Sequence, residues 1–239
     1  VQLSPDGKHF ITTYSNVSTP QKRTLLSTTG KVVKELGDSK ADDFDQFIYG
    51  KTELIFIPSE DGKYQLPATI TYPTDFDKTK RYPVVMSIYG GPNAGNVTNS
   101  WKGTGNQWWA NEGVIQISVD HRASGQFGKE GVALMHRSLG KWEIKDYGTA
   151  AKWLKAQNWV DNKKLLITGH SYGGYISALA LTMGADDFDF GYAGAPVTSW
   201  ELYDTHYVER FMDTPQENPE GYKAASVLTY VDKYKGLLR

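Results

Sequence analysis

The sequence predicts an α/β fold: a doubly wound, mostly parallel sheet preceded by a few short β-strands. Three nearly continuous apolar runs, at residues 83–89, 114–119 and 164–168, are typical of strands buried on both faces. Residues 143–157, between the last two runs, place Ile144, Tyr147, Ala151 and Leu154 at helical spacing, and the acidic end comes first. Alternation of strand and helix favours a parallel sheet.

Residues 1–50 predict a β-meander. Turn signals such as Ser4-Pro5-Asp6-Gly7 separate short strands at 9–14, 23–27 and 30–33. Such a unit has too little apolar surface to fold by itself. It is therefore either an extension packed on the main domain or the last blade of a β-propeller.

Residues 51–239 predict a partial α/β domain that opens with an antiparallel hairpin. The two hairpin strands lie at 54–57 and 66–72, and the turn Glu60-Asp61-Gly62-Lys63 divides them. We expect the domain to be incomplete at its C-terminal end, because the chain ends where a further strand should begin.

Composition excludes several classes of function. The 26 Lys and Arg residues balance 27 Asp and Glu residues, so we expect no nucleic-acid partner. The absence of cysteine excludes disulfides, thiolate nucleophiles and Cys-based zinc sites. The five histidines show no metal-binding spacing, so neither a metal nor a cofactor is expected. No stretch approaches the length of a membrane span.

The strongest chemical motif is Gly-His-Ser-Tyr-Gly at residues 169–173, directly after an apolar run. It matches the Gly-x-Ser-x-Gly nucleophile elbow of the α/β-hydrolase fold, in which a sharp strand-to-helix turn exposes the serine hydroxyl. The flanking glycines let the backbone pack tightly around the strained residue, and only small side chains fit there. Ser171 is therefore the predicted nucleophile, and the backbone N–H of Tyr172 is a predicted oxyanion donor.

Tyr89-Gly90-Gly91-Pro92 follows the first buried strand, at the sheet edge where ligand loops of parallel sheets gather. We interpret the Tyr89 hydroxyl as the second oxyanion donor. The alternative is a plain glycine turn with a packed tyrosine.

An apolar stripe follows a further predicted strand near residues 192–195, after the elbow. Val197, Trp200, Tyr203 and Tyr207 recur at spacings of three, three and four, which predicts one face of a helix. The stripe is either ordinary core packing or an aromatic pocket for a substrate side chain.

Asp120 and Arg122 follow a buried strand but precede the serine. Hydrolases of this architecture run in the order nucleophile, acid, histidine, so these two residues are not catalytic candidates. We expect them to form structural ion pairs beneath the active-site loops.

Four motifs together resemble the prolyl oligopeptidase family, most closely its dipeptidyl peptidase IV branch. They are Gly-His-Ser-Tyr-Gly-Gly-Tyr, Tyr-Gly-Gly-Pro, Leu-Gly-Lys-Trp-Glu (139–143) and the segment from Trp200 to Arg210. The resemblance covers residues 53–239 and implies that the first strands are the closing propeller blade. It implies Ser171 as nucleophile and Tyr89 and Tyr172 as oxyanion donors. It further implies that Arg210 orients polar groups or the peptide backbone, and that the pocket for the residue before the cleaved bond comprises Tyr172, Val197, Trp200, Tyr203 and Tyr207.

The resemblance implies a serine peptidase that cleaves after proline or alanine through an acyl-enzyme and releases dipeptides from peptide amino termini. The partner of such a peptidase would be a peptide substrate. The resemblance favours a periplasmic or secreted location and leaves open whether the full-length parent is a homodimer. The alternatives are an acylaminoacyl peptidase or carboxylesterase of the same fold, or a non-catalytic binding protein that keeps a hydrolase shell.

The family's catalytic aspartate and histidine would lie beyond Arg239, so the chain alone is expected to be inactive. His206, the one histidine after Ser171, is not expected to replace them. An unfinished sheet would also expose an apolar edge, which predicts self-association or the presence of the missing segment.

Overall fold

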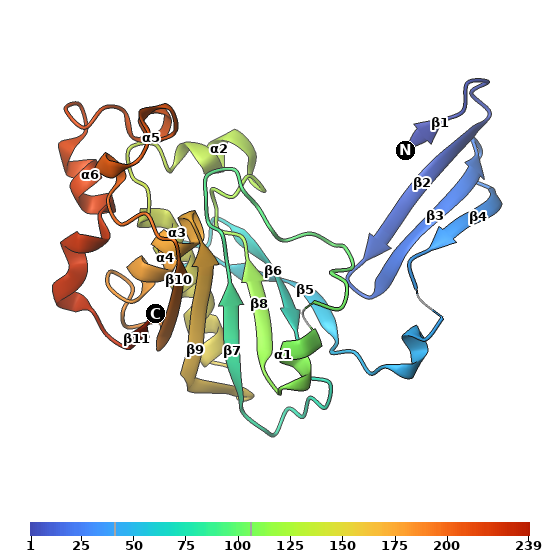
Figure 1. The fold of residues 1–239 in the computed structure, drawn as a ribbon, viewed down its shortest axis with the longest axis horizontal. Helices are drawn as coiled ribbons and strands as arrows, with labels where there is room; N and C mark the ends of the chain where they lie inside the picture. The colour runs from blue at the N-terminus through green and yellow to red at the C-terminus, as the bar shows by residue number, and fades with distance from the viewer. Residues whose placement is uncertain (41, 106) are drawn as a thin grey trace.

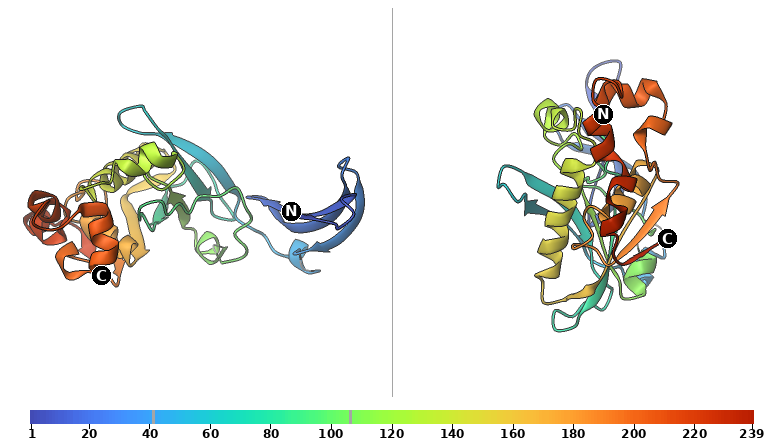
Figure 2. Two further views of the ribbon diagram at one scale, coloured as in Figure 1. Left: turned by 90° about the horizontal axis from the view of Figure 1, so that it is seen from above. Right: turned by 90° about the vertical axis from the view of Figure 1, so that its left-hand side faces the viewer.

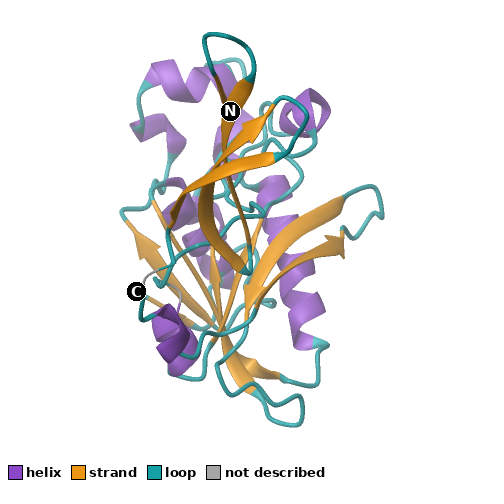
Figure 3. Cartoon of the chain, turned by 90° about the vertical axis from the view of Figure 1, so that its right-hand side faces the viewer, coloured by secondary structure: helices purple, strands orange, loops and turns teal. Residues whose placement is uncertain are grey.

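The computed structural model describes residues 1–40, 42–105 and 107–239, and their strands form two sheets (Figure 1). The first sheet is antiparallel, in the order β1-β2-β3-β4, and confirms the predicted meander. It curves away from the rest of the molecule at one end (Figure 2) and projects toward the viewer in Figure 3. Its strands are β1 (Gln2–Leu3), β2 (His9–Asn16), β3 (Thr19–Ser27) and β4 (Val32–Asp38).

The second sheet has seven strands in the order β11-β10-β9-β7-β8-β6-β5. β5 and β6 form the predicted antiparallel hairpin, and β6 is antiparallel to β8. The remaining strands are parallel to their neighbours, as predicted. The strands are β5 (Thr52–Pro58), β6 (Gln65–Thr71), β7 (Tyr82–Ser87), β8 (Ile115–Val119), β9 (Val160–His170), β10 (Phe190–Gly194) and β11 (Leu237–Leu238).

Helices lie on both faces of this sheet. α3 (Lys141–Lys155) and α4 (Tyr172–Ala180) pack on one face against β9, and α4 also packs against β10. α1 (Gln107–Asn111) lies on the other face against β8 (Figure 1). The other helical segments are α2 (Gly128–Ala133), α5 (Thr205–Met212), α6 (Pro219–Ala225) and the 3-10 turns η1 (Phe44–Gln46), η2 (Trp200–Leu202) and η3 (Val227–Lys233). No helix in the described ranges is long and apolar enough to cross a membrane.

α3 buries the face that its sequence predicts. Ile144, Tyr147, Ala151 and Leu154 are all buried in the main core, beneath the sheet. Burying a large aliphatic side chain contributes about 1.5–3 kcal/mol. The helix begins two residues before the predicted start because the Glu143 side chain accepts a hydrogen bond from the Gly140 N–H (2.9 Å).

A loop at residues 97–105 contacts both the N-terminal sheet and residues 44–49, which follow that sheet in the chain. The Trp101 ring lies 5.7 Å from the Phe44 ring and 5.9 Å from the Tyr49 ring. The Asn99 side chain accepts a hydrogen bond from the Val17 N–H (3.2 Å). Hydrogen bonds therefore hold the end of β2 and its turn to this loop, whereas the aromatic contacts hold residues 44–49, which follow the N-terminal sheet.

One helix prediction was wrong. The stripe from Val197 to Tyr207 is not a single helix: η2 ends at Leu202, Tyr203 is extended, and α5 starts anew at Thr205. The reason is Asp204, whose carboxylate accepts the Tyr207 N–H (2.9 Å) and thereby caps a second helix.

Candidate active site

Ser171 stands at a sharp turn between the last residue of β9 and the first residue of α4. Its φ of 59° and ψ of −115° are strained for a side chain other than glycine. Two hydrogen bonds hold this backbone: the Ser171 N–H donates to the Gly194 carbonyl (2.8 Å), and the Tyr175 N–H donates to the Ser171 carbonyl (3.0 Å). The half-buried serine is thus fixed at the carboxyl end of a central strand.

The flanking glycines permit this turn because backbone from neighbouring strands lies directly against them. A Cβ atom at Gly169 would stand 2.5 Å from the Ile88 carbonyl oxygen, and one at Gly173 would stand 2.6 Å from the same atom. A Cβ at Gly174 would collide with the Gly194 carbonyl. The elbow is therefore wedged between the ends of β7 and β10.

Tyr172 contributes two different groups to the site. Its amide N–H opens α4, where the first N–H groups have no partner within the helix and can face an anion. Its side chain is buried, and its hydroxyl donates a hydrogen bond to Glu143 Oε1 (2.6 Å). Burial, followed by the Glu143 charge, raises the pKa of the Tyr172 phenol well above its ordinary value, so the phenol stays protonated.

Tyr89 follows the end of β7 on the loop that faces the elbow. Its side chain is 38% exposed, so a ligand can reach it, and its ring centroid lies 6.2 Å from that of Tyr172. Gly90 adopts a φ of 77°, and a Cβ at this position would stand 3.1 Å from the Tyr147 hydroxyl. The glycine turn therefore sets the direction in which Tyr89 leaves the strand.

The aromatic residues come together although they do not share one helix. The Trp200 ring lies 5.3 Å from Tyr172, 5.8 Å from Tyr203 and 6.1 Å from Tyr207, with which it is stacked. Trp200 is buried, Tyr203 is 43% exposed, and Val197 is half-buried against the core. The cluster forms an apolar surface beside the elbow, of a kind that suits a flat ring.

Arg210 and His206 lie exposed on α5. The Arg210 guanidinium lies 5.6 Å from the Phe211 ring centroid. Burial, together with the neighbouring tyrosines, raises the pKa of Tyr207, and the positive charge of Arg210 opposes this shift. Arg210 thus lies close enough to act on the pocket electrostatically.

Arg122 forms the predicted structural ion pairs, deep under the loops. Its side chain is 1% exposed, and its guanidinium contacts Asp146 (2.6 Å) and Asp61 (2.9 Å) and lies 4.2 Å from the Trp142 ring centroid. The same prediction for Asp120 was wrong, as the next contacts show.

Asp120 makes no ion pair in the part of the chain that the structure describes. Its carboxylate instead accepts the N–H groups of Asn96 (2.8 Å) and Val97 (3.0 Å) and the Gln126 side-chain amide (2.9 Å). Asp120 therefore fixes the loop that follows Tyr89-Gly90-Gly91-Pro92. Hydrogen bonds from backbone amides satisfy this buried carboxylate in place of a cation.

Sequence reasoning missed one contact of the site, the buried carboxyl of Glu143 beneath Tyr172. Burial raises the pKa of Glu143 from its ordinary 4.5 to about 7, although the hydrogen bonds from Tyr172 and Gly140 oppose the shift. A glutamate three residues after a helix cap is a capping signal in the sequence. Nothing in the linear order indicates that it reaches residue 172.

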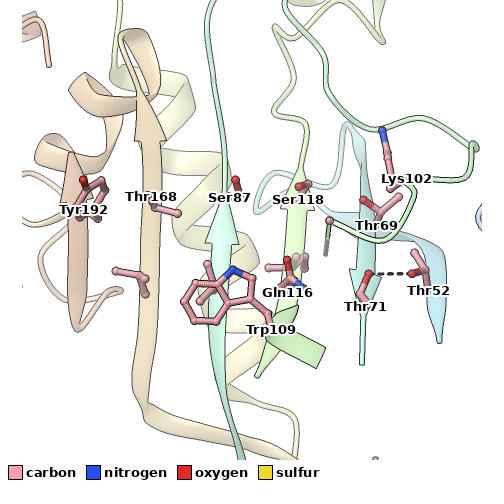
Figure 4. A pocket seen from close by; sticks show the side chains of 14 residues that line it. Thr52, Thr69, Thr71, Ser87, Lys102, Trp109, Gln116, Ser118, Thr168 and Tyr192 are labelled. Atoms are coloured by element: carbon pink, nitrogen blue, oxygen red, sulfur yellow. Dashed lines mark hydrogen bonds between the residues drawn. The ribbon is translucent and has the colours of Figure 1, made fainter. Parts of the chain in front are cut away.

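No group of three or more His, Cys, Asp or Glu side chains suited to a metal ion occurs in residues 1–40, 42–105 and 107–239. A separate hollow of about 480 Å³ lies on the sheet face that carries α1 (Figure 4). Trp109 covers part of it, and hydroxyl and amide side chains such as Ser87, Gln116 and Thr168 line it. Neither Ser171 nor the aromatic cluster belongs to this hollow.

The sheet order and the strained serine between strand and helix match the α/β-hydrolase fold and the backbone geometry of its nucleophile elbow. The model of the prolyl oligopeptidase family matches residues 100–238. The chain belongs to this family of serine peptidases.

Relatives of this chain carry related names. It is 36% identical over 166 residues to the probable dipeptidyl-aminopeptidase B of Ajellomyces capsulatus. This match covers 69% of this chain and 18% of that protein. It is 40% identical over 157 residues to the probable dipeptidyl-aminopeptidase B of Neurospora crassa. This match covers 65% of this chain and 17% of that protein. The chain therefore spans about a fifth of the length of these curated relatives.

Two solved structures share its fold. A putative dipeptidyl aminopeptidase IV from Bacteroides ovatus superposes with a TM-score of 0.90 at 32% identity, covering 99% of this chain and 34% of that one. Dipeptidyl peptidase 4 from Porphyromonas gingivalis superposes with a TM-score of 0.88 at 34% identity. The match covers 98% of this chain and 34% of that one. The likeness extends over both sheets of the chain, including the N-terminal one.

Proposed function

We propose that this chain is part of a serine peptidase that cleaves peptides after proline or alanine and releases dipeptides from their amino termini. The observation that carries the proposal is the position of Trp200. Its ring joins Tyr172, the residue after the predicted nucleophile, to Tyr203 and Tyr207. An apolar aromatic surface next to the elbow suits the flat pyrrolidine ring of proline.

In the proposed reaction, Ser171 Oγ attacks the carbonyl carbon of the scissile bond and gives its proton to a general base. The Tyr172 N–H and the Tyr89 hydroxyl then donate hydrogen bonds to the oxyanion that forms. Collapse of this intermediate breaks the carbon–nitrogen bond, and the leaving amine takes the proton from the base. Water then hydrolyses the acyl-enzyme in the same way.

We further propose that the base and its aspartate partner come from polypeptide outside residues 1–239. The chain covers about a third of each solved relative, which leaves room for them. Asp204, the acidic residue nearest to His206 in sequence, caps α5 with its carboxylate. Its carboxylate is therefore engaged at the start of the helix, and we assign His206 no part in the reaction.

The test is the release of a chromogenic amine from a Gly-Pro substrate with a free amino terminus. The polypeptide translated from the complete reading frame should turn the substrate over, and Ser171→Ala should lower kcat by at least about 10³-fold. Residues 1–239 alone should show no turnover above that of the Ser171→Ala variant. Brisk turnover by residues 1–239 would refute the proposed origin of the base.

The rival activities within the fold are those of an acylaminoacyl peptidase and a carboxylesterase. Substrates with blocked amino termini and simple esters separate these from a dipeptidyl peptidase, which needs the free amine. The rival from another class, a binding protein with a hydrolase shell, predicts no turnover of any substrate. Retention of the strained Ser171 beside Tyr89 argues against it.

A further inference from the structure

The hydroxyl of Tyr172 is anchored by a buried carboxyl that the proposed reaction does not use. Tyr172 Oη donates to Glu143 Oε1 (2.6 Å), and the Gly140 N–H donates to the same oxygen (2.9 Å). Glu143 is 0% exposed, and its Oε2 has no hydrogen-bond partner among the described residues. Burying a carboxyl group among aromatic side chains costs free energy of folding unless its oxygens are hydrogen-bonded.

We propose that Glu143 is a positioning residue for the peptidase reaction, which acts through the Tyr172 hydroxyl to hold both the oxyanion amide and the wall of the proline pocket. The inference rests on the proposed function. It assigns Glu143 no contact with the substrate, so Glu143 is not a catalytic residue in the sense used for Ser171.

The geometry explains how one hydrogen bond reaches both parts of the site. The Tyr172 ring packs 5.3 Å from Trp200 and 5.4 Å from Tyr175, so it forms part of the aromatic surface. The same residue begins α4 and carries the amide next to Ser171. If its acceptor were lost, the hydroxyl would stay buried without a partner or the ring would turn. Either change would move the pocket wall, and with it the start of the helix.

The surroundings also decide how strong this bond is. The titratable groups that face Glu143 are Asp146 and Tyr147 on its own helix, Tyr172 and Tyr175 on α4, and Tyr207 on α5. Arg122 neutralises Asp146, and the tyrosines stay protonated. An ionised carboxylate accepts a shorter and stronger hydrogen bond than a neutral carboxylic acid. We therefore expect the anchor to tighten as Glu143 loses its proton near neutral pH.

A simpler role for Glu143 is that it only caps α3 through Gly140. The variant Glu143→Gln separates the two roles, because glutamine at this helix position also accepts the Gly140 N–H. It keeps the size of the side chain but never carries a charge. The matched control is Glu130→Gln, which removes an exposed carboxyl from the first turn of α2.

Kinetics on the complete polypeptide supply the first test. Glu143→Gln and Tyr172→Phe should each lower kcat/KM for the Gly-Pro substrate by about tenfold, whereas Glu130→Gln should change it by less than twofold. The double variant should be no more than about twofold worse than the poorer single variant, because both changes cut the same link. Multiplicative effects would overturn the proposal, as would an unchanged kcat/KM in Glu143→Gln.

A second test does not depend on turnover and separates this inference from the proposed function. In protein labelled with ¹⁵N-tyrosine and ¹⁵N-glycine, the Tyr172 amide shift should titrate with a midpoint near pH 7, and the titration should vanish in Glu143→Gln. A Gly140 amide that titrates while the Tyr172 amide does not would show a helix cap only. If the wild type lacks peptidase activity but the Tyr172 amide titrates, the proposed function fails while the anchoring contact stands.

Discussion

Gly173 lies so close to the carbonyl oxygen of Ile88 that a Cβ atom on it would stand 2.6 Å away. This contact fixes the first turn of α4 against the end of β7 and thereby places Ser171 beside the loop that carries Tyr89. No ordinary Cβ contact is that short, so the backbone would have to move to accept a side chain.

Gly173→Ala should therefore damage the elbow. We expect a loss of about 1–3 kcal/mol in the free energy of unfolding, measured by urea denaturation, and a loss of activity in the complete polypeptide. Gly37→Ala is the control, because a Cβ there meets no atom within 4 Å. Equal effects of the two substitutions would contradict the close packing described above.

Tyr203→Leu should weaken the proposed proline pocket without unfolding the protein, because Tyr203 is 43% exposed and packs on Trp200. We expect KM for the Gly-Pro substrate to rise about tenfold, with Tm within about 2 °C of the wild type. Leu202→Ala, in the same turn and 86% exposed, should change neither quantity. An unchanged KM in Tyr203→Leu would remove this residue from the pocket.

Asp146→Asn should be among the most destabilising single changes in the chain. It leaves the Arg122 guanidinium, 1% exposed, without its bidentate partner, which costs about 3–5 kcal/mol for a buried charge. The matched control is Asp186→Asn, which breaks an exposed pair with Lys235 and should cost less than about 1 kcal/mol. Urea denaturation of both variants at low and high salt checks the difference.

Stability should fall as pH rises from 4.5 to 7 because of Glu143. Burial raises the pKa of Glu143 to about 7, so in this window the folded protein holds a proton that the unfolded chain has already released. The contribution is complete below pH 4.5 and is lost above pH 7. Relative to Glu143→Gln, the wild type should lose up to about 3 kcal/mol between these values. A constant difference between the two proteins would show that Glu143 does not titrate there.

Residues 1–239 expressed alone should self-associate. β11 is a two-residue strand at the edge of the seven-stranded sheet, and Leu237, Tyr192 and Phe190 beside it are 64%, 53% and 37% exposed. Unpaired strand edges with exposed apolar side chains favour pairing between chains. Light scattering should show a species larger than a monomer, and Leu237→Lys should reduce it. A monodisperse monomer at millimolar concentration would contradict this expectation.

Much of this protein could be read from the sequence because the signals are local. The glycines around Ser171, the buried strand runs and the apolar face of α3 follow from backbone sterics and periodicity. The aromatic stripe shows where such reasoning stops. Its spacing predicted one helix, yet Asp204 competes for the Tyr207 N–H and breaks it in two.

Contacts between residues far apart in the chain leave no local pattern in the sequence. Asp120 is followed two residues later by Arg122, and the sequence suggested ion pairs for both. The fold instead places Arg122 beside Asp146 and turns Asp120 toward the amides of Asn96 and Val97. Which acceptor a buried donor finds depends on how α3 docks on the sheet, and side-chain type alone does not set that.

By itself, the sequence determined the sharp strand-to-helix turn at Ser171, because that turn needs small residues at fixed spacing. It also determined the alternation of strands and helices that builds the sheet. The tertiary structure alone decided that β8 lies between β6 and β7, that Trp200 joins Tyr172 to Tyr207, and that Glu143 holds the Tyr172 hydroxyl. The reason is physical: backbone preferences act between neighbours in the chain, whereas burial and hydrogen bonding act between neighbours in space.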